Sequence, residues 1–167
     1  YQPVAVQKYS SGVWSTIKTV TSTTGTYTTA VASTERTSYR FVFAGSVALL
    51  GSTGATITVK PKAYLTTPAI AATSVRLGSS FVASGFLRPH YTSGASNVSL
   101  VFQRWNGSAW VTKKTVAAAN ANHLTYTKYS RSTSLPYTGR WRVRAVFAST
   151  TRNADTSAGY DYLSVSR

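Results

Sequence analysis

Apolar and polar residues alternate along much of the chain with a period of two. The pattern is clearest in the stretch 139–147. Its apolar residues are Trp141, Val143, Ala145 and Phe147, and its basic residues, which alternate with them, are Arg140, Arg142 and Arg144. Successive side chains of a β-strand point to opposite faces, so this pattern predicts strands with one buried face. The stretch 98–105 alternates in the same way, and apolar residues at helical spacing are not found. The sequence therefore predicts an all-β fold.

Turn residues separate the alternating stretches. Asn106-Gly107 lies between two tryptophans, and both of its residues tolerate the positive φ angles of a tight hairpin turn. Ser11-Gly12 takes the same place near the start of the chain. Many short strands joined by frequent turns predict antiparallel β-sandwiches of the immunoglobulin type.

Two stretches of the chain are copies of each other. The matched residues include Gln7, Trp14 and Arg40 in the first copy and Gln103, Trp110 and Arg144 in the second. The offset between matched residues rises from 96 at Gln103 to 104 at Arg144, which short loop insertions in the second copy explain. Repetition of one supersecondary unit predicts a modular array.

The repeat divides the chain into two modules, 1–62 and 63–167, joined at Pro61. Over thirty residues, including the stretch 81–87, precede the first matched strand of the second copy, whereas three precede that of the first. We therefore expect the first module to lack its N-terminal strands and the chain to be a piece of a longer one. A sheet without those strands offers an open edge, which favours a strand-swapped homo-oligomer as one alternative.

One set of stretches carries a family resemblance: 6–9, 12–14, 39–45, 50–53 and 57–59 in the first module and 84–90, 94–95, 110–116, 139–145 and 160–162 in the second. With these residues the sequence resembles the immunoglobulin-like tandem repeats of large secreted and cell-surface proteins of actinobacteria and related Gram-positive bacteria. The resemblance covers nearly the whole chain. It implies β-sandwich modules, a secreted or cell-surface location and an auxiliary role beside other domains of the parent chain. It brings no catalytic motif.

Basic residues far outnumber acidic ones. The chain has 18 Lys and Arg against three Asp and Glu, which gives a formal net charge of +15 at pH 7. Such an excess favours polyanion partners, among them an anionic cell-wall polymer or polysaccharide. Because there is no helix for a major groove and no recognised nucleic-acid module, we expect no specific nucleic-acid partner. No apolar run reaches the length of a membrane span.

The sequence offers few groups for catalysis or metal binding. Cys is absent, and the acid–base groups are Glu35, Asp155, Asp161, His90 and His123. Their spacing matches no paired-carboxylate, nucleophile-elbow or zinc motif. We therefore expect no enzyme activity, no catalytic residues, no metal and no cofactor.

The arginines of 139–147 are the best candidates for binding. Alternation places Arg140, Arg142 and Arg144 on one face, about 6.5 Å apart, and guanidinium groups suit phosphate and carboxylate oxygens. The alternative is a solvated sheet face on which the arginine stems cover neighbouring aliphatic side chains. The remaining polyanion-binding candidates are Arg88, His90 and Lys113, and for His90 the alternative is a turn in which Pro89 fixes the bend.

Aromatic residues flank the hairpins of both copies. Trp14 and Trp110 recur as tryptophan, so we expect them in the core, as we do Trp141. Trp105 is replaced by Tyr9 in the first copy. We therefore expect these two at the surface, where exposed aromatic rings stack on sugars.

The sequence as a whole predicts a non-catalytic spacer and adhesion module of a larger secreted or cell-surface bacterial protein. Its basic faces would bind anionic envelope polymers. One alternative is a carbohydrate-binding module that uses aromatic stacking. Another is a strand-complemented subunit of an extracellular assembly, in which a strand from a second chain completes the first module.

Overall fold

The computed structural model describes residues 2–167, and the secondary structure of that range consists of β-strands without helices. The prediction of an all-β fold is confirmed. Contacts between Cα atoms divide the chain into two compact units, unit 1 (Tyr1–Pro61) and unit 2 (Lys62–Arg167).

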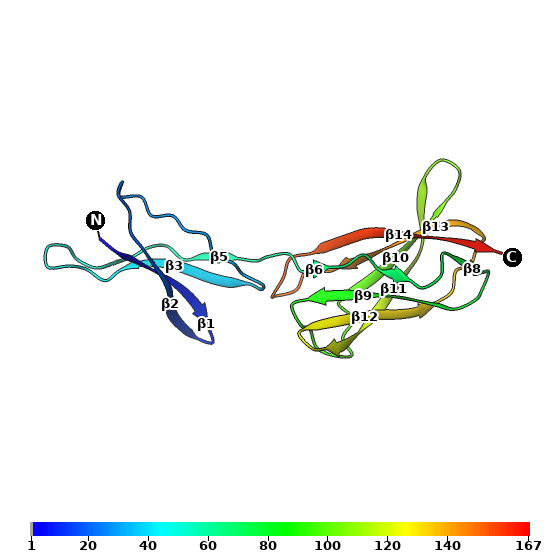
Figure 1. Ribbon diagram of the computed structural model, residues 1–167, viewed down its shortest axis with the longest axis horizontal. Helices are drawn as coiled ribbons and strands as arrows, with labels where there is room; N and C mark the ends of the chain where they lie inside the picture. The colour runs from blue at the N-terminus through cyan, green and yellow to red at the C-terminus, as the bar shows by residue number, and fades with distance from the viewer. Residues whose placement is uncertain (1) are drawn as a thin grey trace. The chain divides into compact units, whose positions relative to one another are not determined.

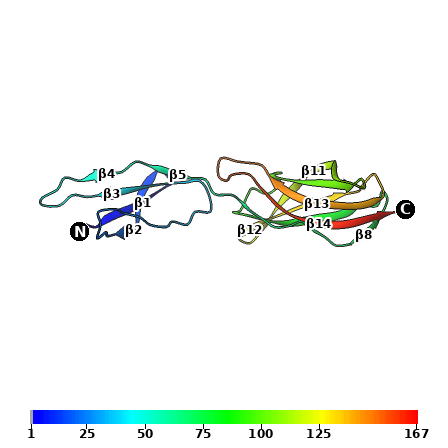
Figure 2. The ribbon, with the colours of Figure 1, turned by 90° about the horizontal axis from the view of Figure 1, so that it is seen from above.

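Unit 1 contains a single antiparallel sheet with the strand order β2-β1-β3-β4, in which β5 also pairs with β3 (Figures 1 and 2). Its strands are β1 (Val4–Ser10), β2 (Val13–Val20), β3 (Thr37–Phe43), β4 (Ser52–Thr53) and β5 (Ile57–Val59). Between β2 and β3, residues 21–36 contain no strand. Two tyrosines tie this segment to the sheet: Tyr39 donates a hydrogen bond to the carbonyl of Ala32 (3.3 Å), and Tyr27 donates one to that of Gln2 (2.9 Å).

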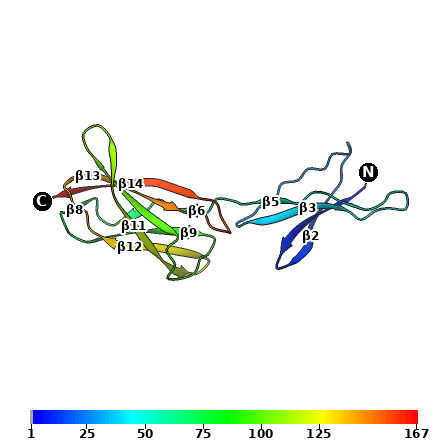
Figure 3. The ribbon, with the colours of Figure 1, turned by 180° about the vertical axis from the view of Figure 1, so that it is seen from behind.

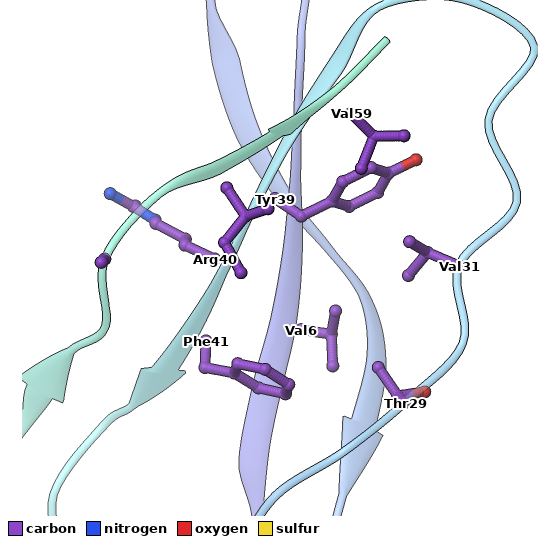
Figure 4. A pocket seen from close by; sticks show the side chains of 9 residues that line it. Val6, Thr29, Val31, Tyr39, Arg40, Phe41 and Val59 are labelled. Carbon is purple, nitrogen blue, oxygen red and sulfur yellow. The ribbon is translucent and has the colours of Figure 1, made fainter. Parts of the chain in front are cut away.

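The buried side chains of unit 1 lie between its sheet and the segment 21–36. Val6 and Tyr39 are both buried. Figure 4 shows Thr29 and Val31 of the segment on the side of the sheet from which these two side chains project. Together they line a cavity of about 110 Å³. Within residues 2–61, one sheet and one irregular segment therefore form the core.

Unit 2 has nine strands in the order β6-β9-β12-β11-β10-β13-β14-β8, with β7 also paired to β9. They are β6 (Tyr64–Leu65), β7 (Ala69–Ile70), β8 (Ser74–Arg76), β9 (Phe81–Arg88), β10 (Val98–Trp105), β11 (Trp110–His123), β12 (Tyr126–Thr133), β13 (Gly139–Phe147) and β14 (Thr156–Ser166). The named pairs of unit 2 are antiparallel except that β8 runs parallel to β14.

The long strand β11 belongs to two layers. Its first part pairs with β10 as far as Ala118, and its second part pairs with β12 from Ala119 onward. Figures 1 and 3 show β9 and β12 on one side of unit 2 and β13 and β14 on the other, and Figure 2 shows β13 beside β14. A strand that changes layers in this way closes the two sheets over a common core.

The core of unit 2 consists of the residues that alternation in the sequence selects. Fully buried side chains include Leu100, Phe102, Trp141, Val143, Ala145 and Phe147. The even-numbered residues of β13 from 140 to 146 are exposed or half-buried, so the predicted division of this strand into two faces is confirmed. Each large apolar side chain that is buried in this way contributes about 1.5–3 kcal/mol.

Tyr129 of β12 crosses Gly85 of β9 inside this core. The two residues are direct partners in the ladder, and a Cβ atom on Gly85 would overlap the Tyr129 hydroxyl. That hydroxyl donates a hydrogen bond of 2.7 Å to the carbonyl of Thr66. Burial raises the pKa of Tyr129 to about 12. Only glycine leaves room for this tyrosine.

The two predicted hairpins both form, but they use different turns. Ser11-Gly12 is a two-residue turn in which both φ angles are positive, 52° and 83°. The second loop spans 106–109, and only Gly107 has a positive φ there, 106°. Asn106 acts through its side chain, because its Oδ1 accepts hydrogen bonds from the backbone amide of Ser108 (2.9 Å) and from the next amide (2.8 Å).

Candidate functional site

The arginines of β13 lie on the outer face of the layer that contains β10, β13 and β14. Arg142 and Arg144 are half-buried and Arg140 is exposed. The opposite side of the same strand carries core residues such as Trp141. We call Arg140, Arg142 and Arg144 the arginine row.

Arg142 is held by three side chains from the strands β10, β11 and β14. Its Nε donates a hydrogen bond of 2.8 Å to Oε1 of Gln103. Its guanidinium carbon lies 3.8 Å from the ring centre of Tyr160 and 4.8 Å from that of Trp110. A cation over an aromatic face is attracted by the ring quadrupole. The orientation of this guanidinium group is therefore fixed before any ligand arrives.

Unit 1 contains the same arrangement. The Nε of Arg40 donates a hydrogen bond of 2.9 Å to Oε1 of Gln7, and its guanidinium carbon lies 4.2 Å from the ring centre of Trp14. The structural counterpart of Arg40 is thus Arg142. The sequence comparison matched Arg40 with Arg144, which is wrong by two residues. It aligned the apolar residues that follow each arginine, and this shifted the alignment by two residues, the period of a strand.

The hairpins that carry the tryptophans also correspond in detail. In both units the register shifts immediately before the glutamine, at the same place in the repeat. The ring centres of Trp105 and Trp110 lie 5.4 Å apart at 56°, and those of Tyr9 and Trp14 lie 5.1 Å apart at 52°. Features shared by both units in this way are explained by the architecture that both units have in common.

Trp14 and Trp110 are not core residues, so that prediction was wrong. Both are half-buried on the outer face. The register shift in each hairpin is a bulge, which adds one residue between the tryptophan and the core-facing positions of its strand. The tryptophan therefore points to the opposite face. Tyr9 is 44% exposed, in line with its predicted surface position, whereas Trp105 is half-buried. Trp141 is fully buried, as predicted.

The flanking arginines of the row have no counterpart in unit 1. Once Arg40 is superposed on Arg142, the ladder places Ser38 at the position of Arg140 and Val42 at that of Arg144. The guanidinium carbon of Arg144 lies 5.5 Å from the ring centre of Tyr160, and its Nε is buried without a hydrogen-bond partner. These features belong to unit 2 alone and are not required by the shared architecture.

A hollow of about 260 Å³ lies beside the arginine row. Its lining includes Trp110, Arg140, Tyr162, Ser164 and Thr73. Tyr162 is 53% exposed, and its ring meets that of Trp110 edge to face, with centres 5.9 Å apart at 66°. The hollow thus combines two aromatic rings, a cation and hydroxyl groups.

No carboxylate pairs with the arginine row in the described part of the chain. Asp161 of β14 is directed elsewhere: its Oδ2 accepts a hydrogen bond of 3.0 Å from the amide of Ile70, and its Oδ1 accepts one of 2.9 Å from the amide of Tyr162. Asp161 therefore has a structural role, in which it satisfies two backbone amides. Within residues 2–167, no carboxylate therefore neutralises the positive charge of the row.

Tyr160 and Tyr162 are the site residues that sequence reasoning missed. Both lie on β14, directly beside β13, where Tyr160 pairs with Arg144 and Tyr162 with Arg142. The signal was present, since two tyrosines two residues apart share one face of a strand. What the sequence lacked was the identity of the neighbouring strand.

The other three polyanion-binding candidates do not belong to the row. Arg88 ends β9 in the opposite layer, where its guanidinium carbon lies 5.6 Å from the ring centre of Tyr126. His90 follows the cis peptide bond between Arg88 and Pro89, and its carbonyl accepts a hydrogen bond of 2.9 Å from a guanidinium nitrogen of Arg152. Lys113 is the unpaired residue of the bulge in β11, separated from β13 by β10.

Neither a metal centre nor a membrane span is found in the described range. Across residues 2–167, the side chains of His, Asp and Glu do not gather in a group of three that could hold a metal ion. In the same range, no helix has the length and apolar character needed to cross a membrane.

Comparisons with known proteins add no identification. No protein-family model, no curated protein and no solved structure matches the chain. The function must therefore be argued from the geometry and charge of the outer face of unit 2.

Proposed function

We propose that this chain is a non-catalytic binding module that holds a linear polyanion along the arginine row of unit 2. The observation that carries the proposal is that Arg140, Arg142 and Arg144 lie on one face without a carboxylate partner. Arginines whose Cα atoms lie about 6.5 Å apart along a strand can engage successive phosphate or carboxylate groups with their guanidinium groups. Because aromatic rings and Gln103 already fix Arg142, less side-chain entropy is lost on binding.

We further propose that unit 2 is an immunoglobulin-like sandwich and that unit 1 is the corresponding part of a second one. Two observations support this. The layers β7-β9-β12-β11 and β11-β10-β13-β14 follow the strand order of such domains. In unit 1, β2-β1-β3-β5 repeats β11-β10-β13-β14, and the segment 21–36 takes the place of β12 in the chain.

In this proposal the chain acts as a spacer and adhesion module of a larger secreted or cell-surface bacterial protein. Its ligand is an anionic cell-wall polymer or an acidic polysaccharide. The net charge of +15 supports this, because it raises the local concentration of any polyanion around the molecule. The arginine row then supplies the site at which the polymer is held.

The experiment measures the affinity of the full chain for polyphosphate over a range of salt concentrations. Affinity should fall steeply as salt rises, because each arginine that binds a charged group releases counterions. The double variant Arg140→Gln/Arg144→Gln should bind at least tenfold more weakly and show a smaller salt slope. A matched variant, Lys128→Gln/Arg131→Gln, removes the same charge from exposed residues of β12 in the other layer. Equal losses in both variants would refute a local site.

Unit 1 supports a second candidate function, a subunit that is completed by a strand of another polypeptide. In unit 2, β9 and β12 cover the core face of β10 and β13, whereas among residues 2–61 only the segment 21–36 lies over that face. Apolar residues remain open around it: Ile57 is 62% exposed and Val31 is 37% exposed. A strand with the apolar alternation of β9 fits this face, since β-strand addition requires an unpaired neighbour.

A synthetic peptide with the sequence of residues 79–88 tests this second candidate on the full chain. Binding should protect the amides of 21–36 from hydrogen exchange, because these residues would pair with the peptide as β12 pairs with β9. A scrambled peptide of the same composition is the control. Failure of the native peptide to protect this segment more than the scrambled one would exclude the candidate.

A further inference from the structure

We infer that the hollow beside the arginine row is a subsite for one sugar ring of an acidic polysaccharide. The inference rests on the proposed polyanion-binding function and adds the class of polymer. An arginine row alone accepts any chain of negative charges, with or without rings. The hollow gives a reason to prefer a polymer whose repeating unit contains a ring.

The first observation is the composition of the hollow. Trp110 and Tyr162 form a corner of two aromatic rings at 66°. Arg140 lies at the same hollow, as do Ser164 and Thr73. An aromatic face packs against the C–H face of a pyranose, hydroxyl groups can exchange hydrogen bonds with the sugar hydroxyls, and the guanidinium group binds an acidic substituent.

The second observation is size and position. The hollow measures about 260 Å³, which is below the range of roughly 300–1,000 Å³ that holds drug-sized ligands, so it suits one ring and not an oligomer. Arg142 and Arg144 continue from Arg140 along β13. A polymer with one ring in the hollow can therefore extend along the row, with its next acidic groups over these two arginines.

The shape of the aromatic corner favours a sugar over a nucleobase. Single-stranded nucleic acids bind to platforms on which flat bases stack face to face with aromatic rings. Here the rings of Trp110 and Tyr162 meet edge to face, and Arg142 already lies over Trp110. A flat base could stack on only one ring of this corner, whereas a puckered ring can present C–H groups to both.

Unit 1 serves as an internal comparison. It keeps the Gln7–Arg40–Trp14 arrangement but has Ser38 at the position of Arg140, and Thr58 pairs with Ser38 as Ser164 pairs with Arg140. The cation of the hollow is thus absent from the copy that shares the supporting architecture. This separation is expected when the supporting contacts serve the fold and the added residues serve a ligand.

The test compares ring-bearing and ring-free polyanions on the full chain. Polygalacturonate and dextran sulfate carry their acidic groups on sugar rings, whereas polyphosphate carries acidic groups without any ring. Oligo(dT) represents nucleic acid. Tyr162→Ala should weaken binding of a ring-bearing polymer about tenfold, because the loss of one stacked ring has about this effect. The same change should alter polyphosphate affinity less than twofold. Tyr64→Ala, at a 63% exposed tyrosine of β6, is the matched control and should change neither.

The outcomes separate this inference from the proposed function. A loss confined to polygalacturonate or dextran sulfate supports the subsite and identifies its acidic group. Polyphosphate binding that depends on the row, with no effect of Tyr162→Ala on any polymer, overturns the subsite alone. An equal loss with oligo(dT) overturns the assignment to a sugar, and absence of binding to every polyanion overturns both proposals.

Arg140→Gln provides a second variant at an exposed residue and should weaken the binding of all polyanions that bind the chain.

Discussion

At the scale of single residues, similar side chains take different roles in the two units. Arg40 and Arg142 are each held by a glutamine and a tryptophan, and their contacts agree closely. Arg140 and Arg144 have no counterparts in unit 1. Arg140 lines the exposed hollow, and the Nε of Arg144 is buried without a hydrogen-bond partner. We therefore regard Arg142 as a positioning residue of the sheet as well as a member of the proposed binding row, and its two neighbours as residues that the sheet itself does not require.

Replacing Arg142 with alanine should destabilise unit 2 by about 2 kcal/mol. The change removes a hydrogen bond worth about 1 kcal/mol and two cation–π contacts worth about 0.5–1 kcal/mol each. Arg140→Ala, at an exposed position, should change stability by less than about 0.5 kcal/mol. Denaturant unfolding of the full chain measures both, and equal effects of the two substitutions would disprove the division of roles.

Tyr129 should make the stability of unit 2 sensitive to alkaline pH. Burial raises the pKa of its hydroxyl from about 10 to about 12, so the folded protein keeps a proton that the unfolded chain loses. Its contribution is complete below pH 10 and is lost as the pH rises through 12. The decrease should approach about 3 kcal/mol, since each of the two pKa units corresponds to about 1.4 kcal/mol.

A spectroscopic titration of tyrosinate checks this prediction. One of the eleven tyrosines should ionise near pH 12, and the substitution Tyr129→Phe should remove that step. Titration of all tyrosines near pH 10 in the folded protein would show that Tyr129 is not buried as described.

At the scale of elements, alternation in the sequence was a reliable guide where strands are regular. It selected the buried face of β13 correctly, because every second residue of that strand meets the opposite layer. The prediction that Trp110 lies in the core was based on its recurrence as tryptophan in both copies, and it was wrong because a bulge lies between this residue and Val116, which faces the core. Counted in steps of two from Val116, Trp110 should face inward, but the extra residue reverses the side.

The order of strands could not be read from alternation either. Tyr160 and Tyr162 become part of the site only because β14 pairs with β13. Strand pairing depends on contacts between residues far apart in the chain, and a period-two pattern carries no information about them. The repeat placed the counterpart of Arg40 two residues too far along the chain, at Arg144 instead of Arg142.

The loop between β10 and β11 should lose stability when Asn106 is replaced with alanine. Its Oδ1 accepts hydrogen bonds from two backbone amides, so the change should cost about 1 kcal/mol and speed hydrogen exchange in the hairpin. Ser108→Ala, which removes only a hydroxyl bond to the same oxygen, should have a smaller effect. Equal effects would mean that the side chain of Asn106 does not organise the loop.

At the scale of the whole molecule, the excess of positive charge favours an anionic ligand, and the outer face of unit 2 is the place where we propose that it binds. The net charge of +15 is distributed over both units, so composition alone cannot distinguish a diffuse attraction from a defined site. The arginine row differs from the other basic residues because its members share one face with four aromatic side chains, Trp105, Trp110, Tyr160 and Tyr162.

The central claim, that a polyanion is held along the arginine row, is tested most directly by mapping the footprint of bound polyphosphate on the ¹⁵N-labelled chain by NMR. The account predicts that chemical shifts change at Arg140, Arg142 and Arg144 and at neighbouring residues of β14. It also predicts little change along β9 and β12 and in unit 1. Shift changes spread evenly over the basic residues of both units, or centred on β9 and β12, would contradict it.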